Sequence, residues 1–221
     1  MTPEPEPEPE REPEREPEPF RPHPPAVWSG PQRRPVMWAP PVVPARGYEQ
    51  GTRIRRYLPV AVATADLAVS AVPMPLRVLD VGCGDGWLLD ELILRVPQAE
   101  LHVGVDPVRP VLAAAGETVD RRARLVRSAA EALPFDDASF DLVLVLLSLA
   151  QWEHPRAGVA ELARVVTDHG KIIIVDRVSG RGAVGGIDVL LNDAGLVVGQ
   201  VTTLRRSSLL RPRIQAFIAF R

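Results

Sequence analysis

Three glycines and two carboxylates gather in one short stretch of this 221-residue chain. The stretch reads VLDVGCGDG from Val78 to Gly86, and it places Asp80 and Asp85 beside the glycines. Glycine lets the backbone approach a ligand closely and take a positive φ where a side chain would clash. Residues 87–94 carry apolar side chains at helical spacing, so the turn joins a strand to a helix. Such a turn is typical of a ligand-binding site.

A dinucleotide fingerprint, G-x-G-x-x-G, is the first hypothesis because glycine turns often hold phosphates. After Gly82 and Gly84 the third glycine of that fingerprint would fall on Trp87, whereas the chain has Gly86, one residue early. A pyrophosphate also favours a helix N-terminus without a competing anion, yet Asp85 lies at this helix start. A carboxylate there favours a positively charged ligand, such as S-adenosylmethionine (SAM) with its ammonium and sulfonium groups.

Four pieces of sequence resemble the class I SAM-dependent methyltransferases, in particular their type 11 group of small-molecule enzymes. The glycine turn resembles the family's SAM-binding first motif. The other matching segments are HVGVDP (102–107), AEALPFDD with SFDLVLV (130–137 and 139–145), and ELARVV with GKIIIVD (161–166 and 170–176). The resemblance spans residues 77–177. It implies SAM as the cofactor and in-line SN2 transfer of a methyl group to an O, N or C atom of a small molecule.

The resemblance also assigns most of the cofactor site. Asp106, which would bind both ribose hydroxyls, lies about 20 residues beyond the last turn glycine, the spacing that a βαβ unit gives to such a carboxylate. Asp80 and Asp85 would compensate the positive groups of SAM, and Pro107 or Val108 would pack on the adenine. The expected cofactor-binding residues are Asp80, Gly82, Gly84, Asp85, Gly86, Asp106, Pro107, Ala129, Ala130 and Leu147. The alternative is that the glycines and aspartates form only a tight turn and a helix cap, and that Pro107 packs in a loop.

The chain departs from the family pattern at four places, one of which is Asp168-His169-Gly170 in place of the family's P-G-G turn. Ala129 stands where the family commonly has an aspartate that accepts from the adenine amino group, so SAM should bind more weakly unless Ser128 or the backbone compensates. Segment 141–152 is one residue longer than usual, and the region of the substrate lid, 179–186, is short and glycine-rich. A second hypothesis therefore stays open, namely a SAM-fold accessory or regulatory protein without independent catalysis.

A general base is needed only if the acceptor must lose a proton, because alignment supplies most of the acceleration in methyl transfer. His154 follows the fourth strand and is the candidate catalytic base; the alternative is a surface histidine at a helix start. The four scattered histidines suggest no metal site. The arginine clusters lack interleaved aromatic residues, so a small-molecule acceptor is favoured over RNA or another nucleic acid, and over protein.

Composition is consistent with one globular α/β domain, with 46% hydrophobic residues. No apolar run reaches the roughly 18 residues that a membrane span needs, and the acidic N-terminus lacks the features of a signal peptide. A single cysteine cannot form an internal disulfide. We therefore expect a cytoplasmic protein without a membrane partner.

Three regions are expected along the chain: a disordered Pro/Glu-rich tail (1–22), a proline-rich, partly ordered linker (23–47) and a SAM-binding methyltransferase domain (48–221). The tail alternates proline and glutamate, which excludes helix and sheet. Within its first 20 residues eight glutamates outweigh Arg11 and Arg15, which gives that stretch a net charge of −6. It is either a solubilising spacer or a docking segment for a basic partner.

The hydrophobic pattern predicts strands that alternate with helices, hence a doubly wound, mostly parallel seven-stranded sheet of the Rossmann-like class I type with an antiparallel last strand. The expected helices are 51–72, 86–95, 108–116, 156–166 and 184–194. The expected strands are 76–81, 101–105, 123–127, 140–147, 170–176, 197–204 and 213–220. The last two strands have a short link and should form a hairpin.

Overall fold

The computed structural model describes residues 50–179, 183–205 and 212–221, with side chains described for 57–179, 183–204 and 212–221. The helices are α1 (Gln50–Ala71), α2 (Trp87–Arg95), α3 (Arg109–Thr118), α4 (Pro155–Val165) and α5 (Ile187–Asp193), with 3₁₀ turns η1 (Ala130–Ala132) and η2 (Leu149–Gln151). The strands are β1 (Arg77–Val81), β2 (Leu101–Val105), β3 (Ala123–Val126), β4 (Phe140–Leu146), β5 (Val166–Arg177), β6 (Val197–Arg205) and β7 (Ile214–Phe220). The predicted tail and linker, 1–47, lie outside the described residues.

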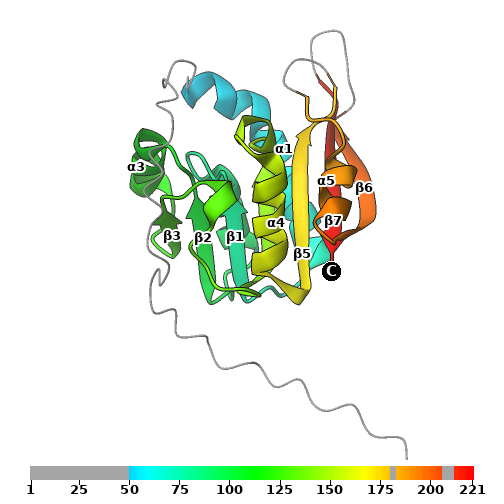
Figure 1. The fold of residues 1–221 in the computed structure, drawn as a ribbon. Helices are drawn as coiled ribbons and strands as arrows, with labels where there is room; N and C mark the ends of the chain where they lie inside the picture. Colours follow the sequence, from blue (N-terminus) through cyan, green and yellow to red (C-terminus); the bar gives the residue numbers. More distant parts are fainter. Residues whose placement is uncertain (1–49, 180–182, 206–211) are drawn as a thin grey trace, which may run out of the picture.

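The seven strands form one sheet in the order β3-β2-β1-β4-β5-β7-β6 (Figure 1). Neighbours from β3 to β5 pair in parallel, β7 pairs antiparallel with β5, and β6 pairs antiparallel with β7. The predicted fold class is therefore confirmed. Chain order reverses between β1 and β4, and in open α/β sheets ligands bind at such a reversal, beyond the carboxyl ends of the strands.

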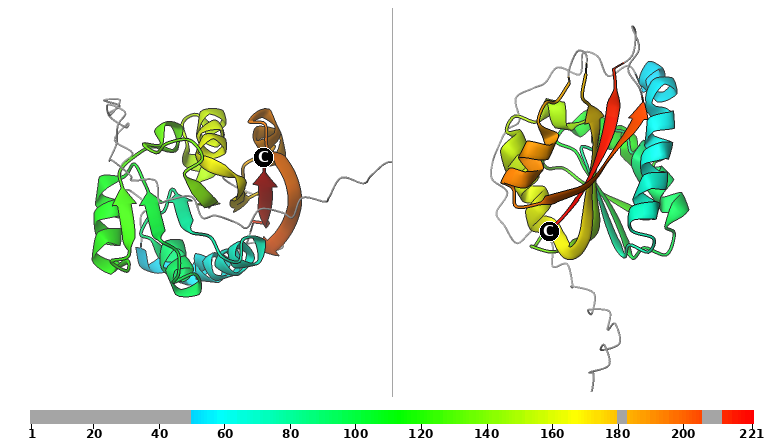
Figure 2. Two further views of the ribbon diagram at one scale, coloured as in Figure 1. Left: turned by 90° about the horizontal axis from the view of Figure 1, so that it is seen from below. Right: turned by 90° about the vertical axis from the view of Figure 1, so that its right-hand side faces the viewer.

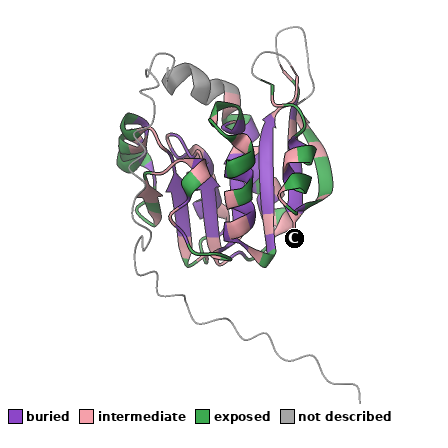
Figure 3. Cartoon of the chain, in the orientation of Figure 1, coloured by how far each residue is buried: buried purple, intermediate pink, exposed green. Residues whose placement is uncertain are grey.

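Helices cover both faces of the sheet (Figure 2). One hydrophobic cluster joins α1 and α2 to side chains such as Leu142 and Leu144 of β4. Another joins α4 and α5 to the alternate residues Val143 and Val145 of the same strand. Because successive strand residues point to opposite faces, β4 is buried on both sides, as Figure 3 shows for the central strands. The central strands are thus fixed, and they hold the loops at their carboxyl ends in place.

Two predicted boundaries are wrong by several residues. Helix α5 begins at Ile187 instead of 184, because Gly186 is its N-cap with a left-handed φ of 66°. Strand β5 begins at Val166 instead of 170, because the backbone is already extended there and pairs with Phe140. The register then shifts, so that Lys171 pairs with Leu142.

No helix among the described residues is long and apolar enough to cross a membrane. Within the same residues, no three or more metal-ligating side chains come together.

Candidate functional site

The glycine turn joins β1 to α2 at the carboxyl edge of the sheet. Its glycines are all left-handed, with φ of 77° at Gly82, 58° at Gly84 and 88° at Gly86. The amides of Gly82 and Cys83 donate to the carbonyl of Val105, at 2.7 and 3.0 Å, and so tie the turn to the end of β2. The turn is therefore a fixed feature of the site.

Two of these glycines are required by contacts within the protein. A Cβ at Gly82 would lie 2.4 Å from Oγ of Ser148, and a Cβ at Gly86 would lie 2.1 Å from Cγ2 of Val119. Both positions need glycine whether or not a ligand approaches, which favours the alternative of a tight structural turn for them. Their contact with a cofactor stays a prediction.

Asp106 follows β2 and lies beside the turn, with 8% of its surface exposed. Its Oδ2 accepts from the amide of Gly84 at 3.1 Å, and its Oδ1 accepts from the amide of Val108 at 2.8 Å. Burial raises the pKa of this carboxyl, whereas the two amides lower it. Each oxygen keeps a second lone pair, so the fixed carboxylate can accept from two neighbouring hydroxyls.

Asp80 lies in β1 and is only 1% exposed. Neither of its oxygens has a hydrogen-bond partner among the described residues. Burial, and then the negative charge of Asp106, raise the pKa of Asp80 to about 7. A buried carboxylate without partners is costly, and a cation or hydrogen-bond donor placed beside it would remove much of that cost.

The loop that follows β4 contacts the glycine turn. Ser148 Oγ donates to the carbonyl of Val81 at 3.1 Å, which links β4 to the end of β1. Leu147 has a φ of 54°, a left-handed conformation that costs a leucine roughly 1–2 kcal/mol. Its amide donates to the carbonyl of Val175 at 2.8 Å, and its side chain packs in the cluster on the α1 side. Such strain is common at functional sites.

The segment expected near an adenine lies beyond β3. Ala129 precedes η1 with an extended backbone and offers no side-chain acceptor, while Ala130 is buried. The hydroxyl of Ser128 donates to the carbonyl of Ala132 at 2.7 Å, so only its lone pairs remain to accept from a ligand. Pro107 is half-buried, and its carbonyl accepts from Nε of Arg127 at 3.2 Å.

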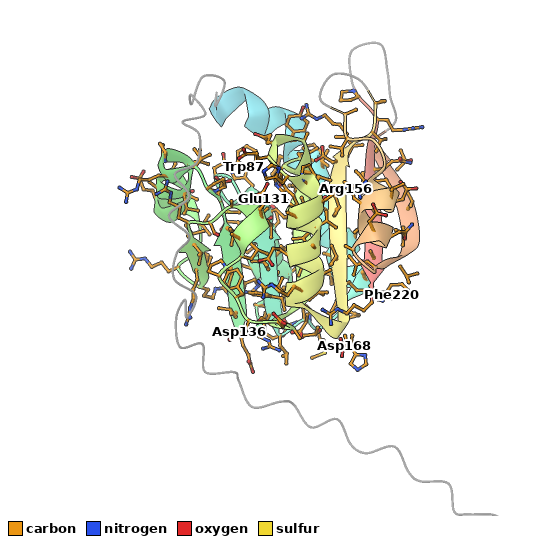
Figure 4. All side chains as sticks on the ribbon, viewed as in Figure 1. Trp87, Glu131, Asp136, Arg156, Asp168 and Phe220 are labelled. Atoms are coloured by element: carbon orange, nitrogen blue, oxygen red, sulfur yellow. The ribbon has the colours of Figure 1, made fainter. Side chains whose placement is uncertain are left out.

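The predicted base, His154, is exposed at the start of α4, which agrees with the alternative of a surface histidine. Its backbone amide donates to Oε1 of Glu131 at 3.0 Å. Figure 4 shows Glu131 and Trp87 at the carboxyl edge of the sheet and Asp136 and Asp168 at the opposite edge.

Asp85 is half-buried in the turn, and its charge raises the pKa of Asp106.

The sequence prediction missed Asp176, a fully buried carboxylate at the end of β5. Its Oδ1 accepts from the amide of Arg177 at 2.7 Å. Burial raises its pKa, and the amides of Arg177, Ala150 and Leu149 lower it. The signal was available, because an acidic residue ends the apolar run IIIVD just as Asp106 ends HVGVD.

Comparison with known proteins agrees with this geometry. Residues 79–174 match the family model described as a methyltransferase domain. This match runs from Leu79 within β1 to Ile174 within β5 and includes every predicted site residue.

Two curated relatives and one solved structure illustrate the similarity. The demethylmenaquinone methyltransferase of Thermus thermophilus is 33% identical over 114 residues, which cover 50% of each chain. The malonyl-(acyl-carrier protein) O-methyltransferase of Halorhodospira halophila is 36% identical over 101 residues, which cover 45% of this chain and 34% of the relative. The chain thus spans about half or less of the length of these relatives. A TehB-like SAM-dependent methyltransferase from Corynebacterium glutamicum superimposes with a TM-score of 0.64 and 19% identity, covering 80% of this chain and 98% of the other.

Proposed function

We propose that this chain, in which residues 79–174 belong to the methyltransferase-domain family of the class I fold, is a SAM-dependent methyltransferase acting on an O, N or C atom of a small molecule. The proposal rests mainly on two carboxylates at the reversal point of the sheet. Asp106 is oriented by two backbone amides, and Asp80 is buried without a partner among the described residues.

The residues present fit the cofactor of this family. When bound, SAM supplies a methyl group on a positively charged sulfur. Asp106 would accept from the ribose hydroxyls, since both of its oxygens have a free lone pair. Asp80 would offset the cofactor's positive charge, with water or backbone in between. Gly84 and Asp85 would line the cofactor between these carboxylates, and Pro107 and Ala130 would flank the adenine.

The names of the relatives support a small-molecule acceptor, because one is a demethylmenaquinone methyltransferase and another methylates a malonyl group on a carrier protein. His154 lies on the surface beside η2, so it would take a proton only from an acceptor bound outside the buried turn. An acceptor that loses its proton to water would need no protein base. A cytoplasmic location belongs to the same proposal.

Calorimetric titration with SAM and with its demethylated product, S-adenosylhomocysteine, tests the cofactor assignment. Asp106→Ala should weaken binding by about ten- to a hundredfold, since hydrogen bonds to charged groups contribute about 1.5–3 kcal/mol. Asp136→Ala is the matched control, because Asp136 is exposed at the opposite edge of the sheet (Figure 4). Equal affinity of the Asp106 variant and the control would show that the ribose lies elsewhere.

A second candidate function is a SAM-fold accessory or regulatory protein without catalysis of its own. Ala129 favours it, because no side-chain acceptor stands there for the adenine amino group. Absence of SAM and S-adenosylhomocysteine binding at high micromolar concentration would support this second candidate and contradict the first.

A further inference from the structure

The two outermost strands of the sheet, β3 and β6, are built differently. Edge strand β3 has four residues and carries Arg124, with Arg121, Arg122 and Arg127 around it. Short strands with charged side chains are a common protection against pairing with another chain. Edge strand β6 has nine residues and no charged residue or proline from Val197 to Leu204. The pairing of β6 with β7 shifts register between Val198 and Gln200 and between Thr203 and Arg205, but β6 lacks the short length and the charged side chains that protect β3.

Strand β6 also exposes apolar side chains on both faces of the sheet. Val197 is 54% exposed and Val201 is 47% exposed, among the few large hydrophobic residues exposed in the described chain. Val201 pairs with Phe217, which belongs to the cluster on the α4 side. Val197 pairs with Phe220 and points to the other face. Figure 3 shows exposed residues along this outermost strand.

Among the described residues, β6 pairs with β7 alone, so no described strand pairs with the backbone donors and acceptors of its outer edge. Nine residues at about 3.3 Å each give an edge of roughly 30 Å. A long edge with no charge before its last residue, Arg205, is a template for another strand.

We propose that β6 pairs antiparallel with β6 of a second copy of this chain, so that two sheets join across a two-fold axis near Val201. An antiparallel pair of identical strands is self-complementary and closes after two copies. When the uncharged stretch 197–204 pairs with its own copy, no like charges come together. The stretch also has no charges that would select a strand from a different protein. The β-branched residues Val197, Val201, Thr202 and Thr203 are suited to cross-strand contacts. The proposal is independent of the methyltransferase assignment.

Light scattering after size-exclusion chromatography tests this interface with the full chain at high micromolar concentration. The wild-type chain should have the mass of a dimer. The double variant Val197→Lys/Val201→Lys should have the mass of a monomer, because like charges brought together across the axis should raise the dimer dissociation constant about a hundredfold or more. The control Val189→Lys, a similarly exposed valine on α5, should stay dimeric.

The near-UV circular dichroism spectrum of the double variant should match that of the wild-type chain, which establishes that the monomer is folded. A monomeric wild-type chain would overturn the proposal, and so would a dimeric double variant. Loss of the dimer in the Val189 control to the same extent would also overturn it, since any surface charge would then have the effect.

Discussion

Asp80→Asn should stabilise the cofactor-free protein at alkaline pH and weaken cofactor binding. The carboxyl of Asp80 is 1% exposed, and burial raises its pKa from 3.8 to about 7. The folded state therefore holds this proton more tightly than the unfolded state. The contribution to stability is fully present below pH 3.8 and is lost as the pH rises through about 7.

The magnitude follows from the shift. At about 1.4 kcal/mol per pKa unit, ionisation of Asp80 should cost the folded state about 4 kcal/mol above pH 7. Asparagine removes the charge but buries an amide, which costs about 1–3 kcal/mol when it lacks partners. The net gain at pH 8 should be about 1–3 kcal/mol, which for a chain of this length raises Tm by roughly 5 °C. At pH 5 the wild-type carboxyl is protonated, so the variant should gain nothing or lose stability.

Thermal unfolding of the cofactor-free protein at pH 5 and pH 8, followed by circular dichroism, measures this effect, and calorimetry at pH 8 measures SAM affinity. We expect a higher Tm at pH 8 only, together with about ten- to a hundredfold weaker SAM binding, because the cation loses its counter-charge. Asp136→Asn, at an exposed carboxylate, should change neither quantity. An equal Tm shift of Asp80→Asn at both pH values would refute this role of Asp80, and so would a stabilised variant with unchanged SAM affinity.

Three further predictions concern other parts of the chain. In a urea titration, Arg164→Ala should lower the free energy of unfolding by about 3 kcal/mol, because the guanidinium binds Glu161 through two nitrogens and donates to the carbonyls of Leu133 and Phe135. The control Arg156→Ala, at an exposed ion pair, should lower it by less than about 1 kcal/mol. Ala129→Asp should strengthen SAM binding about tenfold in calorimetry by supplying the adenine acceptor, and unchanged affinity would mean that the adenine lies elsewhere. Deletion of residues 1–20 should leave Tm within about 1 °C, since a proline–glutamate repeat buries no apolar area, and a large drop would contradict the interpretation as a spacer.

The fold could be predicted because the apolar residues of β1, β4 and β5 form short runs that only a sheet covered on both faces can bury. The boundaries that failed depend on single backbone conformations. Gly186 takes a left-handed φ before α5, and Val166 is extended directly after α4. Hydrophobic periodicity does not report such local conformations.

Only part of the candidate site could be read from the sequence. Asp106 was found because its spacing from the turn is set by local chain geometry. The sequence does not reveal why glycine is required at Gly82 and Gly86, because the side chains that would clash with a Cβ there belong to Ser148 and Val119, which are distant in sequence. The left-handed φ of Leu147, directly after β4, likewise could not be read from the sequence. Contacts between distant segments have no local signature.

The electrostatics of the turn limit what it can bind. Burial, and then the charge of Asp106, raise the pKa of Asp80; burial, and to a smaller extent the charge of Asp85, raise the pKa of Asp106, so the carboxylates repel one another in a buried setting. Burial and then these same charges raise the pKa of the Cys83 thiol, which stays protonated and cannot serve as a thiolate nucleophile. A phosphate would add to the repulsion, whereas a cationic ligand would relieve it. The same carboxylates that make the cofactor-free turn costly thus favour a ligand with the charge of SAM.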